Sequence, residues 1–153
     1  MSEYLAKISW QRHDEDFLNN KYSRAHRWQF DGGTEVAASA SPHIVPLPWA
    51  RPEHVDPEQA FVASLSSCHM LFFLSLAAQQ GFQVDSYEDN AIGTLSRDST
   101  GKHAMTRVCL RPRIEFSGDR RPDSAAIEAL HHAAHEHCFI ANSVRTAIEI
   151  EPA

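Results

Sequence analysis

The longest apolar stretch of the chain runs from Asp56 to Gly81 and predicts a helix. Asp56 suits the N-cap, Pro57 suits the first helical position, and Gln59 can complete a capping box. Gly81 stands where a residue in the left-handed conformation would end the helix. Because nearly every position between these ends is apolar or small, we expect this helix to be buried on all sides.

Alternation of apolar and polar residues predicts three strands before this helix. The first covers Tyr4 to Trp10, the second Tyr22 to Phe30, and the third Thr34 to Ser41. The sequence Asp31-Gly32-Gly33 predicts a hairpin turn between the last two strands. A proline-rich stretch from Ser41 to Val55 then predicts an extended loop that leads into the helix.

Two longer strand patterns follow the helix and are joined by a polar turn. The segment from Val84 to Ser96 is strand-like but irregular, and Asp98 to Lys102 predicts the turn. Met105 to Phe116 alternates clearly and predicts one long strand. Pro112 within this segment indicates an edge strand or a bulge, because proline cannot donate a hydrogen bond to a neighbouring strand.

A second amphipathic helix and a last strand complete the pattern. Asp123 predicts the N-cap of a helix that reaches about His137, and Ala147 to Ile150 predicts the strand. This order of elements describes one α+β domain over residues 1–153, with antiparallel sheets around a buried central helix. A chain of this size cannot easily cover a helix that is apolar on every side, so we expect a second subunit to complete the covering.

The composition limits the classes of partner and the location. Hydrophobic residues make up 42% of the chain and charged residues 22%, which is typical of a soluble globular protein. The net charge of −6 disfavours nucleic acid and anionic membranes as partners. The N-terminus shows no signal-peptide pattern, and three widely spaced cysteines do not make a secreted disulfide framework. We therefore expect a cytoplasmic protein.

The cysteines are the candidates for chemistry. Cys68 lies about three turns inside the predicted central helix, and Cys138 follows the second helix seventy residues later. A free buried cysteine is usually inert, so packing is the first interpretation of both, and Cys109 is interpreted as a packed strand residue. A reactive Cys68 would need a nearby cation, because the helix N-terminus is too distant to stabilise its thiolate.

Cys68 and Cys138 each belong to a sequence motif. Asp56-Pro57-Glu58-Gln59 is followed by small residues up to Cys68, and Cys138 opens the run Cys-Phe-Ile-Ala-Asn-Ser. With the hairpin from Asp31 to Pro42, these segments resemble the osmotically inducible protein C and organic hydroperoxide resistance (OsmC/Ohr) family, in its OsmC-like branch. The chain departs from the family's second motif at Phe139, where the family has proline. The resemblance covers nearly the whole chain and implies the OsmC-like fold and an intertwined homodimer.

The resemblance also implies thiol-dependent reduction of organic hydroperoxides, without a cofactor and with an external dithiol as reductant. It identifies Cys68 as the attacking cysteine, Cys138 as the resolving cysteine, and Glu58 as the acid that orients a catalytic arginine. In one branch the arginine lies on the hairpin arm, where Arg24 fits; in the other it lies in the loop before the helix, near Arg51. We prefer Arg24, because an arginine among aromatic residues on a strand face needs a partner.

Two alternatives stay open on the sequence alone. The first is a catalytically inactive binding protein of the same fold, whose thiols do not turn over. The second is a metal-binding module in the segment from His131 to Cys138, where His131 and His135 share one helix face with Cys138 near. Clustered histidines on a helix are usually solvated, which makes the metal site the weaker alternative. His69 could face the surroundings of Cys68 or the core.

Overall fold

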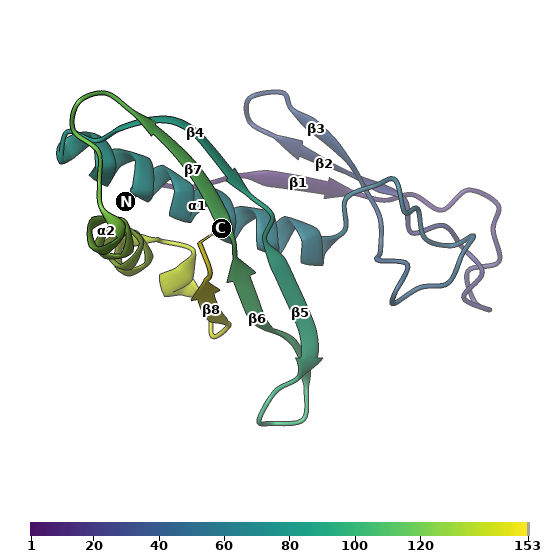
Figure 1. Ribbon diagram of the computed structural model, residues 1–153. Helices are drawn as coiled ribbons and strands as arrows, with labels where there is room; N and C mark the ends of the chain where they lie inside the picture. The colour runs from purple at the N-terminus through teal and green to yellow at the C-terminus, as the bar shows by residue number, and fades with distance from the viewer. Residues whose placement is uncertain (153) are drawn as a thin grey trace. The chain divides into compact units, whose positions relative to one another are not determined.

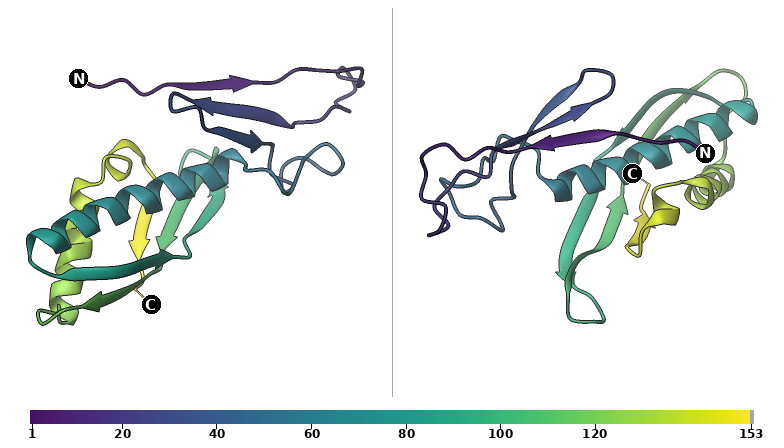
Figure 2. Two further views of the ribbon diagram at one scale, coloured as in Figure 1. Left: turned by 90° about the horizontal axis from the view of Figure 1, so that it is seen from above. Right: turned by 180° about the vertical axis from the view of Figure 1, so that it is seen from behind.

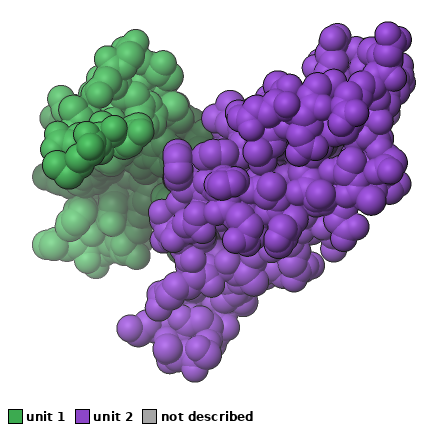
Figure 3. Space-filling model, turned by 90° about the vertical axis from the view of Figure 1, so that its left-hand side faces the viewer, with its two compact units in different colours: residues 1–60 green, residues 61–153 purple. Residues whose placement is uncertain are grey.

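The computed structural model describes residues 1–152. The chain divides into two compact units, Met1–Ala60 (unit 1) and Phe61–Ala153 (unit 2), which Figure 3 shows in different colours. The central helix α1 (Pro57–Gln79) begins in unit 1 and continues in unit 2.

Unit 1 contains a three-stranded antiparallel sheet (Figure 1). Its strands, in spatial order, are β1 (Ala6–Ser9), β2 (His26–Phe30) and β3 (Glu35–Ala38). At the β2–β3 turn the Phe30 N–H donates to the Thr34 carbonyl, and Gly33 has a φ of 86°, which glycine adopts without strain. The predicted strands and hairpin are confirmed, but the second strand is shorter than expected, since residues 22–25 lie outside it.

The ends of α1 agree with the sequence prediction. The Asp56 N–H donates to Gln59 Oε1 at 3.1 Å, and the Gln59 N–H donates to Asp56 Oδ1 at 2.8 Å, which completes the capping box. Gly81 has a φ of 79° just after the helix, as a left-handed C-terminal residue requires. Local sequence therefore defines where this helix begins and ends.

Only one stripe of α1 is buried, so the expectation of burial on every side is wrong for the single chain. The buried residues recur at every fourth position: Leu65, His69, Phe73 and Ala77. Leu71 is 60% exposed. By length and composition alone α1 could cross a membrane, and 22% of its most apolar window is buried within the chain. Many apolar positions of α1 are thus left uncovered by the chain itself.

Unit 2 packs two sheets and a second helix against α1 (Figures 1 and 2). Its elements are β4 (Gln83–Asp89), β5 (Ile92–Arg97), β6 (His103–Leu110), β7 (Pro112–Ser117), α2 (Ser124–His137), the 3-10 helix η1 (Ala141–Ser143) and β8 (Ala147–Ile150). Strand β4 pairs with β7, and β6 lies between β5 and β8. One core cluster joins Phe73 of α1 to Leu130 of α2, and another joins Leu65 of α1 to Val108 of β6.

Three features of unit 2 differ from the prediction. The segment from Val84 to Ser96 forms two strands, β4 and β5, which belong to different sheets. The segment from Met105 to Phe116 forms two strands rather than one, because the chain leaves one sheet at Arg111 and enters the other at Pro112, where no N–H is available. Strand β8 runs parallel to β6, with Ile148 opposite Val108, whereas the other pairs between named strands are antiparallel. The long connection through β7 and α2 makes this parallel pairing possible.

Replacing Gly93 of β5 by alanine should destabilise unit 2. A Cβ at this position would lie 2.4 Å from Val62 Cγ2 and 2.5 Å from Met105 Cε, which is too close for carbon atoms. Overpacking of this kind costs about 1–3 kcal/mol, so we expect a lower urea midpoint for Gly93→Ala. Gly32→Ala is the control, because its added Cβ meets nothing within 4 Å. Equal midpoints for Gly93→Ala and wild type would contradict the packing described.

Candidate functional site

The two cysteines singled out in the sequence are neighbours in unit 2. Cys68 lies on α1 and is partly buried, whereas Cys138 is the C-cap of α2 and only 1% exposed. Both are free thiols. Burial raises the pKa of the Cys138 thiol, and the adjacent Cys68 side chain raises it further. The fold therefore brings together two thiols that are far apart in the sequence.

Helix α2 places Cys138 because the helix begins and ends where the sequence predicts. Asp123 is the N-cap, and its side chain accepts the Ala126 N–H at 2.8 Å. After the helix, the Ala141 N–H donates to Cys138 Sγ at 3.4 Å. Phe139, which stands where the family has proline, is 72% exposed. The turn that holds the Cys138 sulfur thus forms without a proline.

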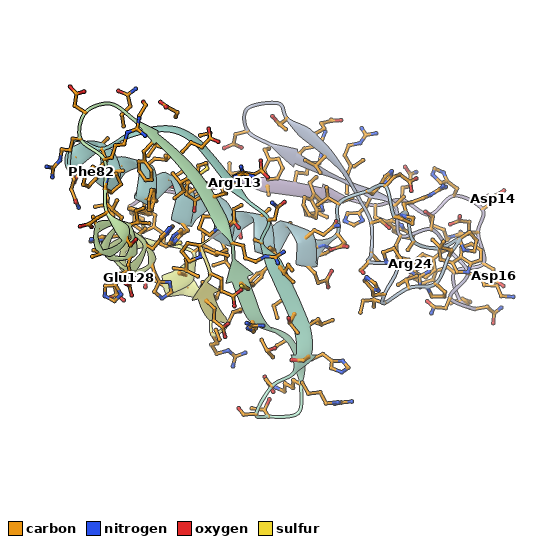
Figure 4. All side chains as sticks on the ribbon, in the orientation of Figure 1. Asp14, Asp16, Arg24, Phe82, Arg113 and Glu128 are labelled. Atoms are coloured by element: carbon orange, nitrogen blue, oxygen red, sulfur yellow. The ribbon has the colours of Figure 1, made fainter. Side chains whose placement is uncertain are left out.

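Arg24 lies in the loop before β2, and the expectation that it belongs to a strand face is wrong. Its guanidinium donates to Asn20 Oδ1 at 2.6 Å and to the Tyr22 carbonyl, and it stacks over the Tyr22 ring at 3.6 Å from the centroid. Figure 4 shows Arg24 among the loops of unit 1. The partners that this arginine needs are supplied by its own loop, and none of the ion pairs found in residues 1–152 joins it to Glu58.

Glu58 lies in the first turn of α1 and has an unusual carboxylate. Its Oε2 atom is buried and has no hydrogen-bond partner within the described part of the chain. Burial of a carboxylate oxygen without a partner costs free energy, so the position favours a cation or a hydrogen-bond donor. Arg51 is exposed, and its backbone N–H donates to Ser39 Oγ at 2.9 Å. Among residues 1–152, neither Arg24 nor Arg51 forms an ion pair with Glu58.

A cavity of about 460 Å³ in unit 1 includes both Arg24 and the first residue of α1 in its wall. The wall consists of Trp10, Phe17, Tyr22, Arg24, His26, Ser39, Ala40 and Pro57. The three aromatic rings of Trp10, Phe17 and Tyr22 pack together, with centroids 4.7 Å apart for the nearest pair. An aromatic cavity with one guanidinium can accept a small apolar molecule with a polar end.

A buried histidine pair lies between α1 and α2, and it was not predicted from the sequence. His69 Nε2 and His131 Nδ1 are 3.0 Å apart, and the two residues are 2% and 3% exposed. Burial lowers the pKa of each imidazole to about 4, so both are neutral at pH 7. One feature of the sequence favours burial of His131: it falls on the apolar stripe of α2 beside Leu130 and Ala134, which are also buried.

The histidine-rich end of α2 does not form a metal site in the described residues. His131 faces His69 instead of pairing with His135 as a ligand set. Within residues 1–152, no group of three or more His, Cys, Asp or Glu side chains is arranged to hold a metal ion. The metal-binding alternative therefore has no support from this part of the chain.

Mixed strands around a long helix, with two adjacent thiols, define an α+β protein of the OsmC type. The sequence model of the family described as "OsmC-like protein" matches residues 50–153, and the chain belongs to this family. An OsmC-like protein of unknown function from Vibrio cholerae is 55% identical, with 100% of each chain covered and a TM-score of 0.98. The resemblance seen in the sequence is thereby confirmed.

More distant solved structures share the fold. An organic hydroperoxide resistance protein from Elizabethkingia anophelis is 16% identical, with 99% of this chain and 94% of that chain covered and a TM-score of 0.71. The organic hydroperoxide resistance protein OhrB of Bacillus subtilis is 20% identical, with 98% of each chain covered and a TM-score of 0.62. No curated protein matches the chain.

Proposed function

We propose that the protein is a cytoplasmic thiol peroxidase that reduces organic hydroperoxides. The adjacency of Cys68 and Cys138 carries the proposal. A partly exposed thiol next to a buried one suits a reaction in which the first thiol meets the oxidant and the second completes a disulfide. The substrate class is supported by relatives of the same fold that are named organic hydroperoxide resistance proteins.

The proposed reaction has three balanced steps. The Cys68 thiolate attacks the terminal oxygen of the hydroperoxide, the O–O bond breaks, and the alkoxide leaves as an alcohol after taking a proton. Cys68 is then a sulfenic acid. Cys138 attacks its sulfur, an S–S bond forms, and the hydroxyl group leaves as water with the Cys138 proton. An external dithiol reduces this disulfide by exchange and is itself oxidised to a disulfide.

We assign the stabilisation of the Cys68 thiolate and of the peroxide to an arginine held by Glu58. The buried, unpartnered oxygen of Glu58 supports this role, because an arginine would satisfy it with a charge-assisted hydrogen bond. Arg24 is preferred to Arg51, because Arg24 lines the same cavity as Pro57. Pro57 is the residue that immediately precedes Glu58 in the chain. Arg24 would have to exchange its bonds to Asn20 for one to Glu58.

We further propose that two copies form a homodimer and that residues 1–153 act as one OsmC-like domain. The exposed apolar positions of α1 support the dimer, because an apolar helix with a single buried stripe is stabilised when a second subunit covers the rest. Sedimentation equilibrium should therefore give twice the chain mass at micromolar concentration. A monomer at that concentration would contradict the dimer but not the chemistry of the thiols.

A turnover assay tests the proposed function directly. Purified protein is mixed with dithiothreitol and either cumene hydroperoxide or hydrogen peroxide, and peroxide loss is followed. Relatives of the same fold are named organic hydroperoxide resistance proteins, so we expect a higher kcat/KM for cumene hydroperoxide than for hydrogen peroxide. Consumption of neither peroxide would reject the enzyme and favour a binding protein of the same fold.

Glu58→Gln should reduce this turnover while leaving the fold intact. The substitution removes the charge that would hold the arginine, and a hydrogen bond to a charged group is worth about 1.5–3 kcal/mol. This corresponds to a loss of about 10- to 100-fold in kcat/KM. The control is Glu53→Gln, because Glu53 is exposed in the loop before α1. If both variants turn over at the wild-type rate, Glu58 has only a structural role at the helix start.

A further inference from the structure

We propose a second binding site in unit 2, for an uncharged apolar molecule that carries a hydroxyl group. The site is a cavity of about 580 Å³ bounded by β7, α2 and the end of β8. Its apolar wall consists of Pro112, Ile114, Phe116, Ile127, Ile150 and Pro152. None of the residues assigned to peroxide reduction lines this cavity, so the proposal does not rest on that function.

The polar feature of the cavity is the imidazole of His131. His131 lines the cavity, is 3% exposed, and has its Nδ1 engaged with His69 Nε2 at 3.0 Å. Its Nε2 is buried and has no hydrogen-bond partner in the described residues. Nδ1 and Nε2 lie on different edges of the imidazole ring, so Nε2 does not face the His69 nitrogen that pairs with Nδ1. A ligand atom that hydrogen-bonds Nε2 would remove the cost of burying an unpartnered nitrogen.

The histidine pair determines which polar group fits. A single proton lies between the two rings, and either nitrogen can carry it. If His131 Nδ1 carries the proton, His131 Nε2 is an acceptor; if His69 Nε2 carries it, His131 Nε2 is a donor. A hydroxyl group both donates and accepts, and it can therefore satisfy either tautomer with one atom. An amide would bring a second polar group against apolar walls.

The charges around the cavity disfavour a charged ligand group at the His131 ring. Burial keeps the His131 imidazole neutral at pH 7, so it does not offer a cation to a carboxylate. Glu128 of α2 also lines the cavity, and Figure 4 shows its position on this helix. Its carboxylate repels an anion at the entrance. The carboxylate of Asp89 acts on His131 from the side of β4 and adds to this negative field. An ammonium group only donates, so it satisfies Nε2 in one of the two tautomers, and the exposed Glu128 carboxylate would hold it at the rim of the cavity, away from the His131 ring.

The dimensions of the cavity suit a small ligand. Ligand cavities in proteins measure about 300–1,000 Å³, and this one is about 580 Å³. Glu128 and His132 are exposed and lie in its wall, so the cavity is open to solvent. An eight-carbon alcohol can lay its chain along the isoleucines and place its hydroxyl group at His131. This class of molecule defines the probe for the experiment.

The test compares 1-octanol, octanoate and octylamine by NMR titration of the full chain. The ring nitrogens of His131 are followed through their long-range proton–nitrogen correlations. We expect octanol to shift the Nε2 resonance of His131 in a saturable way, with octanoate and octylamine at least about tenfold weaker. Equal binding of all three probes, or an unmoved His131 resonance, would overturn the proposal.

Three variants separate the hydroxyl contact from simple apolar binding. His131→Phe keeps a ring but removes Nε2, and should weaken octanol about tenfold. Ile127→Trp fills the cavity from a position one turn before His131 on α2, and should abolish binding while the His69 resonances keep their wild-type pattern. His103→Phe makes the same exchange at an exposed position of β6 and should bind like wild type. Unchanged octanol affinity in both His131→Phe and Ile127→Trp places the probe elsewhere and refutes the site.

Discussion

Cys68→Ser should abolish reduction of cumene hydroperoxide, with a loss of at least about 10³-fold in kcat/KM. The reason is that a serine hydroxyl is not ionised at neutral pH and does not attack the O–O bond as a thiolate does. Cys138→Ser should behave differently, because it keeps the attacking thiol and removes only the partner that completes the disulfide. It should consume about one equivalent of peroxide quickly and then slow down.

The third cysteine provides the matched control for both variants. Cys109 lies in β6 and is 7% exposed, and burial raises the pKa of its thiol. A thiol of this kind is unreactive, so Cys109→Ser should turn over at the wild-type rate. Stopped-flow peroxide consumption by the three single variants measures these differences. Substantial activity in Cys68→Ser, or continued rapid cycling in Cys138→Ser, would refute the assigned order of the thiols.

Acidification should destabilise the fold through the pair His69 and His131. Burial lowers the pKa of both from the ordinary 6.5 to about 4 in the folded chain. Between these values the unfolded chain binds more protons, so stability is complete above pH 6.5 and falls as the pH decreases towards 4. A shift of one pKa unit is worth about 1.4 kcal/mol, and with partial solvent screening each histidine contributes on the order of 2 kcal/mol.

Urea unfolding at pH 7 and pH 4.5 measures this effect. The double variant His69→Leu/His131→Leu removes the two titrating groups and should lose less stability between these pH values than wild type. The neighbouring side chains that influence the pair, His135 on α2 and Asp89 on β4, remain in place in this variant. The control His103→Leu/His132→Leu changes two exposed histidines and should follow wild type. Equal pH dependence of all three proteins would show that the pair does not control acid stability.

The parts of the fold that local sequence determines were predictable. The capping box of Asp56 and Gln59, the glycine after α1 and the Asp123 cap of α2 depend only on neighbouring residues, and each is confirmed. The same holds for the hairpin at Gly33, whose positive φ requires a residue such as glycine. Adjacency of Cys68 and Cys138 was implied only by the family resemblance, because no local rule connects residues so distant in the chain.

The features that the sequence did not reveal depend on tertiary contacts. Alternation continues across Arg111 and Pro112, so the pattern alone does not show that the strand changes sheets there. Likewise, a helix that is apolar all round does not indicate which stripe its own chain buries. The sequence around His69 or His131 alone does not show whether the side chain is buried or exposed. The two histidines form a pair only when α1 and α2 pack together. Arg24 was assigned to a strand because its neighbours alternate, whereas hydrogen bonds to its own loop hold it outside β2.

The central claim is that Cys68 and Cys138 react in turn with one molecule of hydroperoxide. Intact-mass spectrometry of the reduced protein after about one equivalent of cumene hydroperoxide tests this claim most directly. We expect a loss of two hydrogens, about 2 Da, in wild type, and a gain of one oxygen, about 16 Da, on Cys68 in Cys138→Ser. Wild-type protein that keeps its full reduced mass, with both thiols still free, would contradict this reaction sequence.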